Sequence, residues 1–265
     1  YGCDKPDLRF GLELFTANSV LAGTDFRPFA DALETGGTVR GVRYPGGGSL
    51  ARKATDELAE FAKGLGASTL VAIKVPGSEA PVGAAAKLSP EHLSGLVTVA
   101  RAEPGDLLLL IPGERSAVDG ALYRLRLEIG DRLGLKDPRK LHFAWVTDFP
   151  LVERDEAAGR WSAMHHPFTS PKPEDFGMME SDPGAIRAAA YDMVCNGFEV
   201  AGGSIRIHSS EIQARMFGLL GIDEETQRSR FGHILEAFTY GPPPHGGIAW
   251  GFERSVMLLT DTENI

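Results

Sequence analysis

Two carboxylates lie in a spacing that suits metal chemistry on a β-hairpin. The segment 191–208 reads YDMVCNGFEVAGGSIRIH, and its Asn196-Gly197 pair predicts a two-residue type I′ turn because both residues tolerate positive φ. That turn makes Asp192 and Glu199 diagonal neighbours on one side of the hairpin. Like charges so placed repel, and a Mg²⁺ ion held together with substrate phosphates would neutralise them, since Mg²⁺ takes one or two carboxylates and leaves other positions open. The alternative is a pair of solvated acids on an exposed face.

An arginine follows on the same hairpin. Simple alternation from Glu199 would put Arg206 on the opposite face, so we predict a β-bulge at Gly202-Gly203 that adds one residue and brings Ser204 and Arg206 to the acidic face. Glycines there would also let a ligand approach the main chain. A guanidinium in this place can bind a carboxylate through two parallel hydrogen bonds. The competing interpretation is an ordinary ion pair with one of the two acids.

A second motif, PPPHGGIAWGFERSVMLL at 242–259, joins a glycine-rich strand to an apolar helix. Arg254 falls in the first turn of that helix, where the helix dipole disfavours a cation by roughly 0.3–1 kcal/mol. It should therefore meet an anion. Glu253 is one candidate, while the glycines at 246, 247 and 251 favour the phosphates of a closely bound nucleotide.

The first half of the chain predicts a compact α/β unit. From about Val20 to Gly134, short aliphatic runs alternate with segments of helical period. The expected strands are 38–42, 69–75 and 107–111. The expected helices begin after an N-cap at Ser49, at Ser89-Pro90, and before a third apolar face that starts at Val118.

The second half has a different pattern of predicted elements. From His142 the pattern predicts strands, a polar turn at 153–160, the hairpin, two helices and a final strand-to-helix unit. The first of those helices is expected to begin at Ser210 with Gln213 completing a capping box, and the second to stop at Gly241. The adjacent histidines at 165 and 166 lie where a strand meets a loop, and the residue types alone favour a structural role there.

Composition bounds the class of protein. The chain has 265 residues, 43% of them hydrophobic and 24% charged, which is typical of globular proteins and long enough for two domains. A formal charge of −9 argues weakly against a nucleic-acid-binding protein. Cys3 and Cys195 form no metal or disulfide framework, and the longest apolar run, Leu107–Ile111, is far shorter than the roughly 20 residues of a membrane span. We therefore expect a cytoplasmic protein without a membrane partner.

Several of these motifs together resemble one family. GGIAWGFERSVMLL is similar to motif 3 of the class II aminoacyl-tRNA synthetases. With AMHHPFTSPKPEDF, YDMVCNGFEVAGGSIRIH and AFTYGPPPHGGIA, the chain resembles bacterial-type aspartyl-tRNA synthetases along its whole length. The resemblance implies an α+β fold: an antiparallel-sheet catalytic domain, formed here by residues 1–17 and 138–265, interrupted by an inserted α/β domain at 18–137. That insertion resembles a module shared with tRNA-dependent amidotransferase subunits.

The resemblance also implies a role for each matching residue. Arg254 would bind the γ-phosphate of ATP in a nucleotide site lined by Gly251, Phe252 and Glu253; close relatives often have aspartate at the last of these, which keeps the charge. Glu199 would bind ATP through Mg²⁺.

The same resemblance extends to the metal and the amino acid. Asp192 would help Glu199 to hold Mg²⁺. Arg206 would recognise the side-chain carboxylate of aspartate, and His165 on the MHHPF loop would contact the amino acid, with His166 a weaker candidate. Catalysis would depend on Arg206, Arg254 and Glu199.

The implied activity is that of an ATP-dependent aspartate–tRNA ligase. The family forms aspartyl-adenylate and then charges tRNA, with aspartate, ATP and tRNA as partners and a homodimer as the expected assembly. The family's anticodon-binding domain, motif 1 and motif 2 would precede this segment, so the resemblance implies part of a larger protein that has little or no ligase activity alone. Two alternatives stay open: a non-catalytic tRNA-binding or amidotransferase-like accessory protein, and a small-molecule-binding paralogue.

Overall fold

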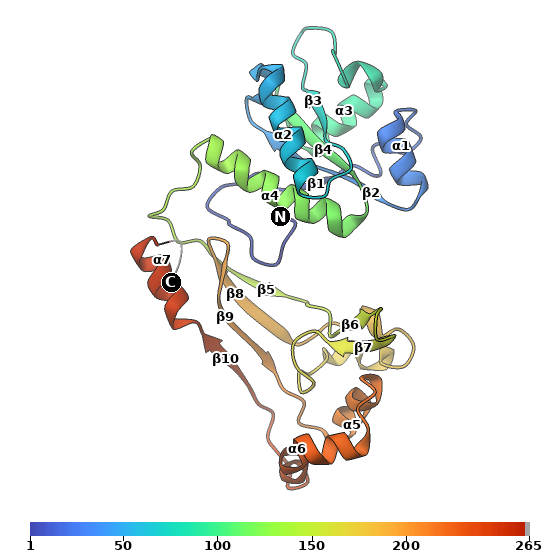
Figure 1. The fold of residues 1–265 in the computed structure, drawn as a ribbon, viewed down its shortest axis with the longest axis vertical. Helices are drawn as coiled ribbons and strands as arrows, with labels where there is room; N and C mark the ends of the chain where they lie inside the picture. Colours follow the sequence, from blue (N-terminus) through green and yellow to red (C-terminus); the bar gives the residue numbers. More distant parts are fainter. Residues whose placement is uncertain (263–265) are drawn as a thin grey trace. The chain divides into compact units, whose positions relative to one another are not determined.

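The protein consists of two compact units, Tyr1–Lys140 and Leu141–Ile265, in a computed structural model that describes residues 1–262 (Figure 1). In both units neighbouring strands pair in antiparallel fashion. The fold is therefore α+β. Within residues 1–262, every helix is too short or too polar to cross a lipid bilayer.

A four-stranded sheet with the order β1-β2-β4-β3 forms the centre of the first unit (Figure 1). Its strands are β1 (Phe15–Thr16), β2 (Thr38–Tyr44), β3 (Val71–Lys74) and β4 (Leu107–Gly113). Its helices are α1 (Arg27–Glu34), α2 (Arg52–Gly64), α3 (Pro90–Val99) and α4 (Arg115–Arg132), with 3-10 turns η1 (Gly47–Ser49) and η2 (Ala85–Lys87). Although helices and strands alternate along the chain, the antiparallel pairing distinguishes this unit from the parallel sheet of an α/β domain.

The run of aliphatic residues in β4 explains why helices cover both faces of this sheet. Successive side chains of a strand point to opposite faces. Leu108 and Leu110 accordingly pack in one buried cluster with residues of α1 and α3, whereas Leu107, Leu109 and Ile111 pack in another with residues of α2 and α4. The predicted strand is thus a central one. Ser89 caps α3 as expected, but α2 begins after Ala51 because Ser49 lies in η1.

Residues before β1 are held in the first unit by a buried arginine of α4. The side chain of Arg126 is fully buried; its Nε donates to the carbonyl of Leu12, and its Nη2 donates to those of Asp7, Phe10 and Gly11 at 2.6–3.0 Å. The guanidinium also lies over the ring of Phe10. This places 1–17 against the first unit, while the assignment of 1–17 and 138–265 to one domain and of 18–137 to an insertion stays a prediction.

The second unit contains a four-stranded sheet with the order β10-β9-β8-β5 and a small hairpin, β6-β7 (Figure 1). The strands are β5 (Phe143–Thr147), β6 (Val152–Asp155), β7 (Arg160–Ala163), β8 (Ala190–Cys195), β9 (Phe198–Ile205) and β10 (Gly246–Trp250). The helices are α5 (Ser210–Leu219), α6 (Glu224–Phe238) and α7 (Phe252–Thr260), with 3-10 turns η3 (Pro173–Met178) and η4 (Pro183–Ala185). A buried cluster joins α5 to the segments between β6 and β8.

The predicted turn of the β8-β9 hairpin is confirmed, but the predicted bulge was placed wrongly. Asn196 and Gly197 have φ values of 51° and 93°. The register shifts at Val200, because Val194 pairs with Glu199 and the preceding Met193 pairs with Ala201. A branched residue therefore forms the bulge, and the two glycines continue the regular ladder.

One helix cap also differs from the expectation. Ser209 rather than Ser210 caps α5, and its hydroxyl accepts from the amide of Ile212. Gln213 consequently lies one position too late for a capping box. Its side chain is buried and its Nε2 donates to the carbonyl of Pro167 at 3.0 Å, which ties α5 to the segment after the two histidines.

Candidate functional site

Two carboxylates converge over a glycine on the β8-β9 hairpin. A Cβ atom built on Gly202 would lie 2.7 Å from Oδ1 of Asp192 and 3.0 Å from Oε1 of Glu199. The two oxygens are therefore within about 6 Å of each other. The bulge at Val200 produces this arrangement, since it puts Glu199 on the same face as Gly202. Any side chain at Gly202 would displace the carboxylates, which explains the glycine.

This pair fits an ion that needs few protein ligands. Within residues 1–262, no group of three or more histidine, cysteine, aspartate or glutamate side chains is arranged to hold a metal. Asp192 is 9% exposed and Glu199 is half-buried, so a bound cation would be partly shielded from water. Two carboxylates with open positions beside them are the protein ligands that Mg²⁺ takes when substrate phosphates complete its shell.

Gly203, the second glycine of the pair, is required for a different reason. A Cβ on Gly203 would overlap the carbonyl oxygen of Gly247 in β10. Gly203 therefore allows the close approach of β10 to β9, and Tyr191 on β8 spans both strands by donating its hydroxyl to the carbonyl of Gly247 at 3.1 Å. Both glycines thus have a reason within the sheet, and the approach of a ligand to their main chain stays a prediction.

The motif at 246–260 brings Arg254 to the backbone of Glu199. Strand β10 runs antiparallel to β9, and the amide of Gly251 donates to the carbonyl of Val200 at 2.8 Å. Gly251 caps α7, and Nη1 of Arg254 in the first turn donates to the carbonyl of Glu199 at 2.8 Å. The carbonyl is a neutral acceptor, so the positive charge of Arg254 remains available to an anion. Phe252 and Glu253 are exposed beside it.

Arg206, just after β9, has a guanidinium nitrogen that lacks a hydrogen-bond partner within residues 1–262. This nitrogen is Nη1, which is buried. The backbone of Arg206 is fixed, because its amide donates to the carbonyl of His245 at 2.9 Å and it forms an isolated bridge with Thr169. A buried guanidinium nitrogen without a partner costs free energy, and a carboxylate ligand would supply the missing acceptor.

The two histidines lie in different surroundings. The ring of His165 contacts Phe149 edge-on at 4.9 Å between centroids. Nδ1 of His166 accepts from the amide of Phe168 at 3.2 Å, which leaves the proton of the neutral ring on Nε2. Burial, and then the nearby Arg206 cation, lower the pKa of His166. His166 is therefore the histidine beside Arg206 and is neutral at pH 7.

The candidate residues form a row along one face of β9. The bulge at Val200 brings Ser204, and by alternation Arg206, to the face of Glu199. Arg206 lies four positions after Gly202, which corresponds to about 13 Å along a strand. The row thus has an acidic end, where Arg254 bonds to the carbonyl of Glu199, and a basic end at Arg206. Ser204 lies on this face as predicted, and its hydroxyl is 3.5 Å from that of Thr169, a further polar group that sequence reasoning did not identify.

A salt-bridge network that the sequence did not reveal fixes the segment between the histidines and β8. Arg187 donates from Nε and Nη2 to the two carboxylate oxygens of Asp175 at 2.8 and 2.9 Å. Lys172 and Arg187 both pair with Asp148. The Arg187 guanidinium lowers the pKa of Asp175 to about 2.

This network predicts acid sensitivity. Because the folded-state pKa of Asp175 lies below its usual 3.8, the stabilisation is fully present above pH 4 and is lost as the pH falls towards 2. We expect Asp175→Asn to lower the thermal unfolding temperature at pH 7 and to reduce the further loss on acidification from pH 5 to 2.5. The exposed Asp182→Asn is the matched control. An equal gap between wild type and Asp175→Asn at every pH would contradict this assignment.

Comparison with known proteins identifies relatives over the whole chain. The family model for class II tRNA synthetases (D, K and N) matches residues 1–265. The "Aspartate--tRNA(Asp/Asn) ligase" of Thermoanaerobacter sp. (strain X514) is 47% identical over 265 residues, which are 100% of this chain and 45% of that protein. The "Aspartate--tRNA ligase" of Clostridium perfringens (strain SM101 / Type A) is 46% identical over 268 residues, with the same coverage. The chain therefore spans about half the length of these relatives. Among solved structures, an aspartyl-tRNA synthetase from Entamoeba histolytica matches with a TM-score of 0.36 and 23% identity, covering 53% of this chain and 24% of that one.

Proposed function

The chain belongs to the class II tRNA synthetases of the D, K and N group, and from that premise we propose that it forms part of the catalytic domain of a bacterial-type aspartate–tRNA ligase. In the full-length protein, aspartate would be activated by ATP to aspartyl-adenylate and transferred to tRNA. We propose a cytoplasmic homodimer with 18–137 as an inserted domain. The accessory-protein and paralogue alternatives are not favoured, because the relatives named above are all ligases.

ATP would bind at the acidic end of the row. Arg254 would meet the γ-phosphate, in a nucleotide site lined by the motif 3 residues Gly251, Phe252 and Glu253. Asp192 and Glu199 would hold Mg²⁺, which neutralises phosphate charge when bound. The hydrogen bond from Arg254 to the main-chain carbonyl of Glu199 supports this proposal, because it links the cation to one of the two proposed metal ligands.

Aspartate would bind at the basic end. Arg206 would hold its side-chain carboxylate, and His165, with His166 as the weaker candidate, would contact the amino acid. The lowered pKa of His166 keeps that ring neutral, so the positive charge at this end belongs to Arg206. A ligand held there would present its other carboxylate towards the acidic end, where the α-phosphate must lie for adenylate formation. The residues contribute by positioning and charge neutralisation.

One observation carries the proposal. Arg206 lies on the same face of β9 as the carboxylate pair, and its buried Nη1 has no hydrogen-bond partner within residues 1–262. The decisive experiment is aspartate-dependent ATP–pyrophosphate exchange by the full-length protein, with asparagine and glutamate as competing substrates. Exchange that requires aspartate is expected. Exchange with another amino acid, or none at all, would reject aspartate activation.

The carboxylate pair gives a prediction about the metal. In the full-length protein, Glu199→Gln is expected to raise the Mg²⁺ concentration needed for half-maximal exchange by roughly tenfold, about 1.4 kcal/mol, because one of two anionic ligands is lost at nearly constant shape. Asp192→Asn should act in the same direction. Glu236→Gln, a change of the same charge on exposed α6, should leave the Mg²⁺ dependence unaltered. A Glu199→Gln protein with an unchanged Mg²⁺ profile would remove Glu199 from the proposed site.

A further inference from the structure

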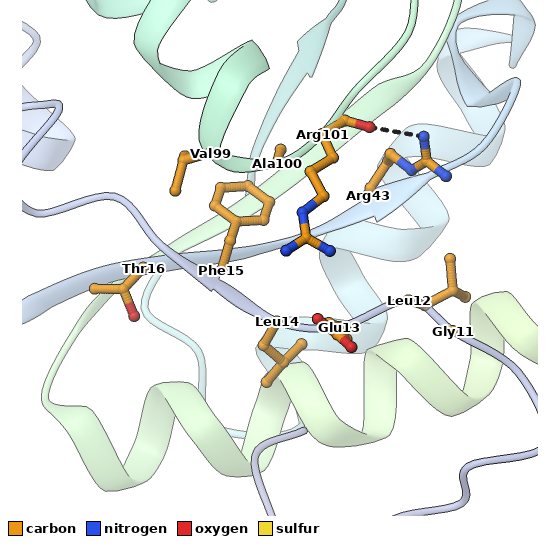
Figure 2. A pocket seen from close by; sticks show the side chains of 10 residues that line it. All are labelled: Gly11, Leu12, Glu13, Leu14, Phe15, Thr16, Arg43, Val99, Ala100 and Arg101. Carbon is orange, nitrogen blue, oxygen red and sulfur yellow. Dashed lines mark hydrogen bonds between the residues drawn. The ribbon is translucent and has the colours of Figure 1, made fainter.

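The first unit contains a cavity that takes no part in the proposed aspartate and ATP sites. It has a volume of about 440 Å³ and is lined by the segment Gly11–Thr16, by Arg43 of β2 and by the end of α3 at Val99–Arg101 (Figure 2). The ring of Phe15 forms an apolar wall, and two arginines and one glutamate supply its charges (Figure 2).

Arg101 occupies a position that favours glycine. The amide of Ala102 donates to the carbonyl of Val97, and the amide of Arg101 to that of Thr98, which is the hydrogen-bond pattern of a Schellman helix end. In this motif the first residue after the C-cap adopts a left-handed conformation. That residue is Arg101, which has a φ of 49°. For a residue with a side chain this conformation is strained, because Cβ comes too close to the following carbonyl oxygen. Strain of this kind is retained more often at functional positions than elsewhere.

The side chain of Arg101 has no internal partner. It makes no hydrogen bond or ion pair with any residue in the described part of the chain, and its guanidinium points into the cavity (Figure 2). A cation near a helix C-terminus is favoured by the dipole, but this requires no particular side-chain direction. The helix dipole therefore accounts for the charge at this position and not for its place inside the cavity.

Arg43 supports the strained residue. Its Nη1 donates to the carbonyl of Arg101 at 2.9 Å (Figure 2). The same atom lies 3.3 Å from Oδ2 of Asp106. Asp106 is itself buried and accepts from the amides of Gly46 and Glu103, so it is a fixed anchor for Arg43. The backbone that carries Arg101 is thus fixed before any ligand arrives, as binding sites require.

We propose that this cavity binds a phosphate group, with Arg101 as its principal ligand and Arg43 as the second cation. Guanidinium groups offer forked donors that match the oxygens of phosphate. The cavity is larger than a phosphate ion, and the Phe15 wall would suit the organic part of a phosphate-bearing compound. The group could come from a free phosphate compound or from a nucleic-acid backbone. None of these residues belongs to the proposed catalytic row, so the two proposals can fail separately.

Glu13 tests whether the cavity binds an anion, because a negative charge there should oppose binding. Its carboxylate lines the same cavity (Figure 2). It accepts a long hydrogen bond of 3.4 Å from the hydroxyl of Tyr1. A phosphate at Arg101 would be repelled by this carboxylate. Neutralising Glu13 should therefore strengthen phosphate binding, whereas removing Arg101 should abolish it, which a purely structural role for either residue would not produce.

The experiment measures the chemical modification of Arg101 in the full-length protein. Phenylglyoxal modifies accessible guanidinium groups, and peptide mass spectrometry gives the extent at each arginine. Inorganic phosphate at about millimolar concentration is expected to protect Arg101, as for a weak anion site. It should not protect Arg52, whose side chain is 94% exposed and makes only a 3.8 Å ion pair. In Glu13→Gln, protection should occur at a several-fold lower phosphate concentration.

A parallel series with tRNA distinguishes the source of the phosphate. Protection at micromolar tRNA would assign the site to a nucleic-acid backbone, and protection by inorganic phosphate alone would assign it to a small compound; both results support the site. Calorimetry with Arg101→Gly, which relaxes the backbone, should show a lost phosphate signal in a protein at least as stable as wild type. Equal modification of Arg101 with and without phosphate and tRNA would overturn the proposal.

Discussion

Replacing Arg206 by alanine in the full-length protein is expected to lower kcat/KM for aspartate in ATP–pyrophosphate exchange by roughly a hundredfold to a thousandfold. Truncating one partner of a buried, hydrogen-bonded charge pair costs about 2–5 kcal/mol, because the other charge is left without a counter-ion. Arg206 is fixed at its amide and at the Thr169 bridge, so its backbone is in place before the substrate binds. Most of the change should appear in KM for aspartate, and KM for ATP should change little.

Two further variants decide whether the guanidinium itself matters. Arg206→Lys keeps the charge but loses the fork, so it should recover only part of the lost kcat/KM. Arg228→Ala removes an exposed arginine from α6 and should leave both KM values unchanged. If Arg206→Ala retains wild-type kcat/KM for aspartate, Arg206 does not bind the substrate carboxylate.

The hairpin shows how far local sequence signals reach. Asn196-Gly197 determined the turn, because a type I′ turn depends on the positive φ of just those two residues. This turn then fixes the pairing of Val194 with Glu199. The bulge could not be located in the same way. Gly202 and Gly203 suggested it, but Gly202 makes room for the carboxylates of Asp192 and Glu199, and Gly203 makes room for β10.

The residues that sequence reasoning missed depend on contacts across long stretches of chain. Arg101 is unremarkable in the sequence, and its significance comes from a helix end and from a cavity wall contributed by Gly11–Thr16. Arg187 and Asp175 are separated by twelve residues without periodicity between them. The charged row itself was predictable in its members, since the hairpin places Asp192 and Glu199 locally, but its length and polarity required the observed bulge.

Arg126 is the clearest case of such a long-range role, and its replacement by methionine should give the largest loss of stability. Methionine fills much of the same space but donates no hydrogen bond. The carbonyls of Asp7, Phe10, Gly11 and Leu12 would lose their common donor, and unsatisfied buried polar groups cost about 1–3 kcal/mol each when they cannot reach water. We expect the free energy of unfolding of the first unit to fall by about 3–5 kcal/mol, unless residues 1–14 detach and recover hydration.

Hydrogen exchange and urea unfolding of the full-length protein separate these outcomes. A detached segment would show fast exchange at the amides of residues 7–14 with a smaller change in the urea midpoint, whereas an attached one would show the full loss of stability. Arg124→Met, an exposed neighbour on α4, should do neither. Because the segment Gly11–Thr16 also forms one wall of the cavity beside Arg101, Arg126→Met should in addition weaken the protection of Arg101 by phosphate. Unchanged exchange together with a loss below about 1 kcal/mol would show that Arg126 does not hold this segment.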